Sequence, residues 1–189
     1  MGPEGRGDLV IVTTWTFVFT LLGTLGLPYA HRYWTAKEPE SSAEIFTNTL
    51  VFSVVASVVI FAVGWLAIPR LISEQKPEII WLTQIFLVNI PIVLLSEMMR
   101  GQLEGARLFG WLGAARISFI AFQAITYAIY YLFHDLTLAH ALVVIVIGQI
   151  LCLAVMVYGV WRNLRPRWSF KWKVFGKEIH YGLRGYLGN

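Results

Sequence analysis

Five long apolar runs constrain this chain more than any other feature of its sequence. Each is longer than the about 20 residues that a helix needs to cross the hydrocarbon core of a bilayer. Glu97 and Arg116 are the only charged residues in them. The runs are apolar on all sides and do not alternate with polar residues, so helices fit them and barrel strands do not. The sequence predicts an all-α, polytopic transmembrane helix bundle over residues 1–161, with spans at about 9–30, 45–68, 79–99, 109–133 and 136–161.

The composition of the 189 residues excludes other classes. Hydrophobic residues make up 57% and charged residues 14%, whereas a soluble domain has about a quarter charged residues and a disordered chain has far less apolar surface. Cys152 is the single cysteine, so an intramolecular disulfide is excluded. Metal-ligand, phosphate-loop and nucleophile motifs are missing, and His134 and His140 fit helix boundaries. We expect no enzyme activity, no metal and no cofactor.

Lysine and arginine are distributed unevenly over the connections between the spans. The connections 31–44 and 100–108 and the tail after the fifth span hold eleven of them, and the N-terminus and the other connections hold three. Because cytoplasmic loops carry the excess of positive charge, the first group should be cytoplasmic, in a multi-pass protein of the cell (inner) membrane. This orientation places Met1 outside the cytoplasm. We therefore expect a further helix upstream, and the short link 134–135 should make the last two spans an antiparallel hairpin.

The tail divides into two parts. Residues 162–182 interleave lysine and arginine with aromatic residues, and they follow a span directly. This pattern favours a cytoplasmic interfacial segment on a bilayer with an anionic inner leaflet, and no nucleic-acid partner is expected. Residues 183–189 resemble the start of a further, truncated helix, so both ends indicate a fragment.

Arg116 is the most informative single residue, because a charge inside a span is costly. It lies about 10 Å along the helix from Phe109. One interpretation is that its side chain snorkels to the headgroups. The other is a fixed cation in a cavity, where a guanidinium holds a phosphate by two parallel hydrogen bonds. On the same helix Gly110, Ala114 and Ser118 form a stripe that would let a neighbouring helix approach closely.

Two spans contain residues that weaken a helix. In the third, Pro91 follows Asn89 and frees a backbone carbonyl one turn earlier, which fits either a cavity lining or a passive kink. Glu97 and Arg100 are three residues apart and could pair on that helix. The first span ends in the stretch 23–28, with two glycines and a proline, which permits bending for gating or as a passive kink.

Three motifs carry a family resemblance. They are Gly2-Pro3-Glu4-Gly5-Arg6-Gly7 before a span ending in Gly26-Leu27-Pro28, Arg100-Gly101-Gln102-Leu103-Glu104-Gly105 followed by Phe109 and Arg116, and Gly182-Leu183-Arg184-Gly185-Tyr186-Leu187. Together they resemble bacterial polysaccharide-unit (O-antigen type) flippases of the multidrug/oligosaccharidyl-lipid/polysaccharide exporter superfamily. Leu108 and Gly113 stand where the family often has a basic residue and an asparagine. The resemblance implies that the chain covers about helices two to six of twelve to fourteen, most of one six-helix lobe of a two-lobe transporter.

The resemblance also implies a function and a set of residues. Alternating access would move a lipid-linked oligosaccharide or polysaccharide unit from the cytoplasmic to the outer leaflet. Arg116 would hold the pyrophosphate of the polyprenyl-pyrophosphate-linked sugar. The sugar path would be lined by Gln84, Asn89 and Gln123, and the cytoplasmic connection motif would comprise Arg100, Gly101, Gly105 and Phe109. Other polysaccharide assembly proteins are candidate partners.

Three rival functions stay open on the sequence alone. A cation-coupled multidrug antiporter of the same superfamily would need an intramembrane carboxylate, for which this stretch offers only Glu97. A membrane-embedded glycosyl- or acyltransferase would need catalytic acids or histidines at a membrane face. A non-transporting membrane scaffold would leave Arg116 to snorkel.

Overall fold

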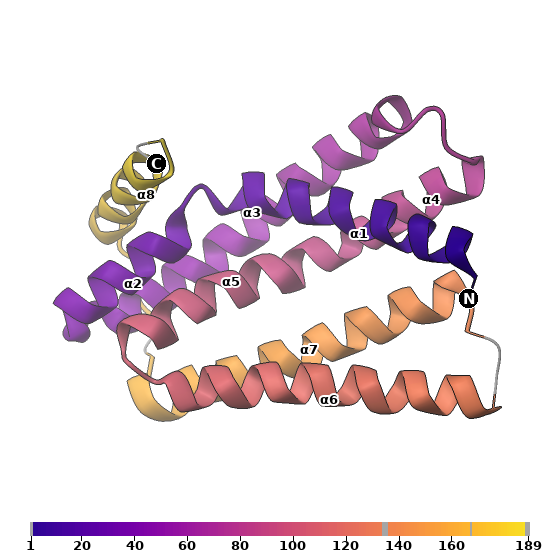
Figure 1. The fold of residues 1–189 in the computed structure, drawn as a ribbon. Helices are drawn as coiled ribbons and strands as arrows, with labels where there is room; N and C mark the ends of the chain where they lie inside the picture. The colour runs from indigo at the N-terminus through magenta and orange to yellow at the C-terminus, as the bar shows by residue number, and fades with distance from the viewer. Residues whose placement is uncertain (1, 134–135, 167, 188–189) are drawn as a thin grey trace.

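The computed structural model describes residues 2–133, 136–166 and 168–187, and this part of the chain is a bundle of helices without a strand (Figure 1). The predicted all-α class is confirmed. The helices are α1 (Pro3–Thr24), α2 (Leu27–Lys37), α3 (Ser42–Leu71), α4 (Pro77–Phe86), α5 (Ile90–Gly105), α6 (Phe109–Phe133), α7 (Leu138–Leu164) and α8 (Trp172–Leu187), with short 3-10 turns at Pro39–Ser41 and Leu87–Asn89.

Five helical stretches among the described residues are long and apolar enough to cross a membrane, by length and composition. They run over Glu4–Thr24, Pro39–Leu71, Pro77–Gly105, Phe109–Phe133 and Leu138–Leu164. The chain is therefore a multi-pass membrane protein. Helices α6 and α7 pack along each other, but the predicted link at His134 and Asp135 lies outside the described residues.

The first helix is shorter at its C-terminal end than the predicted span 9–30. It stops at Thr24 because the next two residues have left-handed backbones, with φ of 47° at Leu25 and 71° at Gly26. Glycine adopts this conformation without a steric penalty, and Pro28 then occupies the first turn of α2, where its missing N–H costs nothing. The bend expected in this stretch is present, and it turns the chain from α1 into α2.

The third span continues further than predicted. Its helix is interrupted by the 3-10 turn at Leu87–Asn89, just before Pro91, which has no N–H to bond the carbonyl of Leu87. It then runs as α5 to Gly105, so the expected connection at 100–108 is mostly helical and only residues 106–108 join α5 to α6. Both glycines of this stretch are helical, Gly105 as the last residue of α5, and α2 packs directly against them.

The connections that carry most of the cations lie at one end of the bundle. In Figure 1 the end of α2, the α5–α6 connection and α8 lie at the end opposite the N-terminus. The segment before α8 is tied to α3 by an ion pair between Lys171 and Glu44, and the N–H of Ser169 donates to Oγ1 of Thr47 at 3.2 Å. Helix α8 runs without a break across the predicted division at 182/183.

A buried polar cluster holds α8 against α2 and α3. His31 of α2 and Glu178 of α8 are each 1% exposed, with 3.7 Å between Nε2 and Oε1. Asn48 of α3 donates from Nδ2 to Oε2 of Glu178 at 3.4 Å. Burial lowers the pKa of His31 to about 4, and burial raises the pKa of Glu178 to about 8. Both shifts favour the uncharged forms, so at neutral pH His31 is a neutral imidazole and Glu178 a protonated carboxyl group.

Docking of α8 should weaken as the pH rises from about 6.5 to about 8. In that range Glu178 of the undocked helix is already deprotonated, whereas docked Glu178 retains its proton. Docking therefore takes up a proton, and the free energy of docking becomes less favourable by about 1.4 kcal/mol per pH unit at the steepest. Between about pH 4.5 and pH 6.5, His31 is protonated in the undocked state and neutral in the docked state, so docking releases a proton there. This release cancels the slope that Glu178 causes. Hydrogen exchange of α8 amides against pH measures the effect. Glu178→Gln should remove the dependence above pH 6.5, and an unchanged slope in that variant would contradict the assignment.

Candidate functional site

Three adjoining cavities open on the side of the bundle where α1, α5, α6 and α7 face one another. The charged cavity has a volume of about 640 Å³ and lies between α1, α2 and α5. The Arg116 cavity, of about 510 Å³, lies between α5, α6 and α7. The amide cavity, of about 260 Å³, is lined by Asn89, Gln123 and Gln149 together with residues of α1. Val93 of α5 lines all three, so they form one continuous concave surface.

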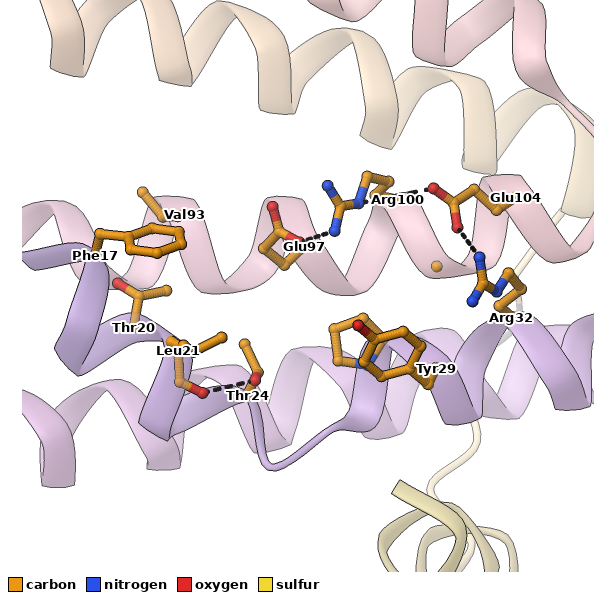
Figure 2. Close-up of a pocket in the computed structure, with 12 residues that line it drawn as sticks. Phe17, Thr20, Leu21, Thr24, Tyr29, Arg32, Val93, Glu97, Arg100 and Glu104 are labelled. Atoms are coloured by element: carbon orange, nitrogen blue, oxygen red, sulfur yellow. Dashed lines mark hydrogen bonds and ion pairs between the residues drawn. The ribbon is translucent and has the colours of Figure 1, made fainter. Parts of the chain in front are cut away.

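A chain of ion pairs crosses the charged cavity (Figure 2). Arg32 of α2 donates from Nη1 to Oε2 of Glu104 at 3.1 Å, and Nε of Arg100 lies 3.8 Å from Oε1 of the same carboxylate. Arg100 also pairs with Glu97, as the three-residue spacing predicts. Two cations and two carboxylates balance one another here. The chain of pairs therefore adds polarity to the cavity but no net charge.

Arg116 supplies the charge that this network does not balance. Its side chain is exposed and lines the Arg116 cavity with Glu97, Arg100 and Glu104. Within the described part of the chain it makes no hydrogen bond and no ion pair. The three arginines around these two cavities face two carboxylates, so the surface has an excess of one positive charge. An unpaired guanidinium on a cavity inside the spans is suited to bind an anion with oxygen acceptors, such as a phosphate.

The amide cavity has a mainly apolar lining with a few polar groups, and it carries no charged side chain among its described lining residues. Asn89 is 1% exposed, and its Oδ1 has no hydrogen-bond partner. The hydroxyl groups of Thr16 and Thr20 on α1 donate to their own helix, to the carbonyls of Val12 at 3.1 Å and of Thr16 at 2.8 Å. Of the residues expected to contact substrate, the structure thus brings Arg116, Asn89 and Gln123 onto one surface.

Gln84 lies elsewhere. It lines none of the three cavities, and its Nε2 donates to the carbonyl of Trp65 in α3 at 2.8 Å. That carbonyl lacks its usual helical partner because the residue four positions later is Pro69, which has no N–H. The amide of Gln84 therefore completes the hydrogen bonding of a proline-containing helix in an apolar environment.

Replacing Gln84 with leucine should lower the stability of the protein without altering the cavities. The variant leaves the Trp65 carbonyl without a donor, at a cost of about 1 to 2 kcal/mol. Thermal unfolding in detergent measures this loss. A Gln84→Leu protein as stable as the unsubstituted chain would show that the carbonyl finds another donor.

The residues of the cytoplasmic connection motif have different positions. A side chain on Gly101 would collide with the backbone oxygen of Pro28, and one on Gly105 would place its Cβ 2.5 Å from the backbone oxygen of Arg32. Both glycines are buried contacts of α5 with α2, four residues apart on one helix face. Phe109 begins α6, and its ring is exposed and lines none of the three cavities.

The stripe of small residues on α6 does not receive a neighbouring helix in the described structure. A Cβ added at Gly110 would meet no atom within 4 Å. The small residues at this interface come from α7, where Gly159 contacts Trp111 and Gly148 contacts Phe119. The bulk of the aromatic side chains on α6 requires this arrangement.

Several cavity residues are not singled out by the sequence. Gln149 lines both the Arg116 cavity and the amide cavity, and its Oε1 is buried without a hydrogen-bond partner. One feature of the sequence could have identified Gln149, because it is the one amide in the fifth apolar run. The threonines of α1 also carried a signal, since Thr13, Thr16, Thr20 and Thr24 recur at a helical spacing.

Comparison with known proteins places these features in a family. The family model described as "Polysaccharide biosynthesis protein" matches residues 1–184. Comparison with curated proteins and with solved structures gave no match. The match spans all five membrane-crossing stretches and most of α8. The chain belongs to the polysaccharide biosynthesis protein family.

Proposed function

We propose that this protein is part of a flippase that moves lipid-linked oligosaccharide or polysaccharide units from the cytoplasmic to the outer leaflet of the cell (inner) membrane. The observation that carries the proposal is Arg116, an unpaired cation on a cavity between membrane-spanning helices. The head of a polyprenyl-pyrophosphate-linked sugar is an anion, and its passage through an apolar layer requires such a cation. Membership of a polysaccharide biosynthesis family supports a saccharide as cargo.

On this proposal the concave surface of the bundle is one wall of a central cavity, and a second lobe forms the other. Alternating access opens the cavity first to the cytoplasmic and then to the outer side. The bend between α1 and α2 and the 3-10 turn in the third span are positions where these helices can flex. The excess of lysine and arginine at the α8 end supports placing that end in the cytoplasm.

Helix α8 and the segment before it fit the surface of the anionic leaflet. Trp168 and Trp172 are 75% and 77% exposed, and Lys171 and Lys173 flank Trp172 in the sequence. Amphipathic aromatic rings favour the headgroup region, and lysine favours anionic lipid. This contact would fix the depth of the bundle during transport.

The charges of the cavity give less support to a cation-coupled antiporter. Such a transporter needs a carboxylate that can release and bind its coupling ion. Glu97 pairs with Arg100, and Glu104 pairs with Arg32 and Arg100. Both carboxylates are thus occupied by arginine, whereas the cation Arg116 is the free group.

The proposal is tested by reconstituting the protein, together with the second lobe that the proposal requires, in vesicles whose outer leaflet contains polyprenyl pyrophosphoryl glucose. We expect the protein to move the lipid to the inner leaflet, where an added external pyrophosphatase no longer reaches it. Vesicles containing a heat-denatured sample of the same protein give the background rate. Equal rates in the two kinds of vesicle would contradict the proposed function.

A further inference from the structure

We propose that the amide cavity is a binding site for the sugar next to the pyrophosphate, with Asn89, Gln123 and Gln149 as its hydrogen-bonding groups. The inference rests on the proposed function and adds a location and a chemistry for the saccharide. Only the structure places Gln149 and the threonines of α1 in this cavity.

The amide cavity lies next to the proposed phosphate site. Arg116 and Gln123 are on the same helix, seven residues apart, which is about 10 Å along the axis and close to two turns. Phe119 and Gln149 line both the Arg116 cavity and the amide cavity. A ligand whose anionic group is held by Arg116 can therefore place its next group in the amide cavity without leaving the surface.

The amides of this cavity are not used by the protein. Neither Asn89 nor Gln149 has a hydrogen-bond partner within the described residues, and the buried oxygens Oδ1 and Oε1 are both left unsatisfied. A buried polar group without a partner destabilises a protein, so a ligand that offers donors to these two oxygens would bind favourably. The amide of each residue offers a donor and an acceptor side by side, which matches the hydroxyl groups of a sugar.

The remaining lining selects a neutral ligand. The threonine hydroxyls of α1 donate to their own helix, so their oxygens are left as acceptors for hydroxyl donors. The rings of Phe17, Phe86 and Phe119 complete the wall, and the described lining holds no charged side chain. A pyrophosphate would find no cation here. An apolar wall with a few convergent polar groups is typical of a site for an uncharged organic ligand.

The test compares two probes that differ only in the sugar. The full chain in detergent is titrated with polyprenyl pyrophosphate and with polyprenyl pyrophosphoryl glucose, as unsubstituted protein and as the Asn89→Leu and Gln123→Leu variants, because these two residues line the amide cavity and not the Arg116 cavity. Each variant should bind the sugar-bearing probe about tenfold more weakly, through loss of one or two hydrogen bonds. Affinity for the sugar-free probe should stay within about twofold, which also shows that the variant is folded. Gln84→Leu is the matched control and should bind both probes like the unsubstituted chain.

The outcomes separate this inference from the proposed function. Equal affinity of the unsubstituted chain for the two probes would overturn the sugar site, as would variants that lose both probes equally or lose neither. The proposed pyrophosphate site would still stand in those cases. Failure of the unsubstituted chain to bind the sugar-free probe would instead contradict the proposed function itself.

Discussion

Gly101→Val is expected to prevent the protein from folding. The glycine lies where α5 crosses α2, and an added Cβ would collide with the backbone oxygen of Pro28. A backbone oxygen cannot move aside as a flexible side chain can, so α2 would have to separate from α5. Helices α2 and α5 share one of the most extensive contacts of the bundle. Overpacking of an interface costs about 1 to 3 kcal/mol even where side chains can adjust, and we expect a larger loss here.

The control for this experiment is Gly113→Val on α6. A Cβ at Gly113 meets no atom within 4 Å, so this variant adds the same side chain to an open helix face. It should give a monodisperse protein with a thermal unfolding temperature close to that of the unsubstituted chain. Gly101→Val should give little folded protein in the same preparation. Similar yields and unfolding temperatures for the two variants would show that α2 and α5 are not in close contact.

Arg116→Ala should lower the affinity for polyprenyl pyrophosphate by about a hundredfold or more. A guanidinium forms two charge-assisted hydrogen bonds with a phosphate, each contributing about 1.5 to 3 kcal/mol. Arg116→Lys keeps the charge but loses the two-pronged geometry, so an intermediate affinity is expected. Titration of the detergent-solubilised protein measures both. Because Arg116 has no partner in the described structure, neither variant should change the unfolding temperature.

The matched control for Arg116 is Arg70→Ala. Arg70 lies in the last turn of α3, which Figure 1 shows at the other end of the bundle from α2 and α8, and it lines none of the three cavities. Its removal takes away one positive charge without touching the concave surface. Equal losses of affinity in the two alanine variants would mean that only the net charge of the protein matters.

The sequence predicts the spans well because a bilayer imposes a strong constraint on each helix separately. Long apolar runs identify all five membrane-crossing stretches of the described residues, and the glycines and proline at the junction of α1 and α2 identify the bend. The end of the third span could not be placed in the same way. Gly101 and Gly105 resemble a connection when read locally, and only the contact with α2 explains why they are helical.

Prediction of the site from sequence is also limited by contacts between residues that lie far apart in the chain. Arg116 stands out because it is a charge in an apolar run, whichever helix it faces. The neutralisation of Arg32 depends on Glu104, which is 72 residues away in the sequence, so no local pattern indicates it. Gln84 and Gln149 are both glutamines with mostly apolar neighbours in the sequence, and only packing shows that Gln84 bonds a backbone carbonyl while Gln149 lines a cavity.

The most direct test of the central claim is the rate at which reconstituted Arg116 variants move polyprenyl pyrophosphoryl glucose between leaflets. Vesicles with equal amounts of inserted protein are compared for the unsubstituted chain, Arg116→Lys, Arg116→Ala and Arg70→Ala. The account predicts an undiminished rate for Arg70→Ala, a reduced rate for Arg116→Lys and the background rate for Arg116→Ala. Transport by Arg116→Ala at the rate of the unsubstituted chain would contradict the account, because the unpaired cation would then have no part in moving the anionic lipid.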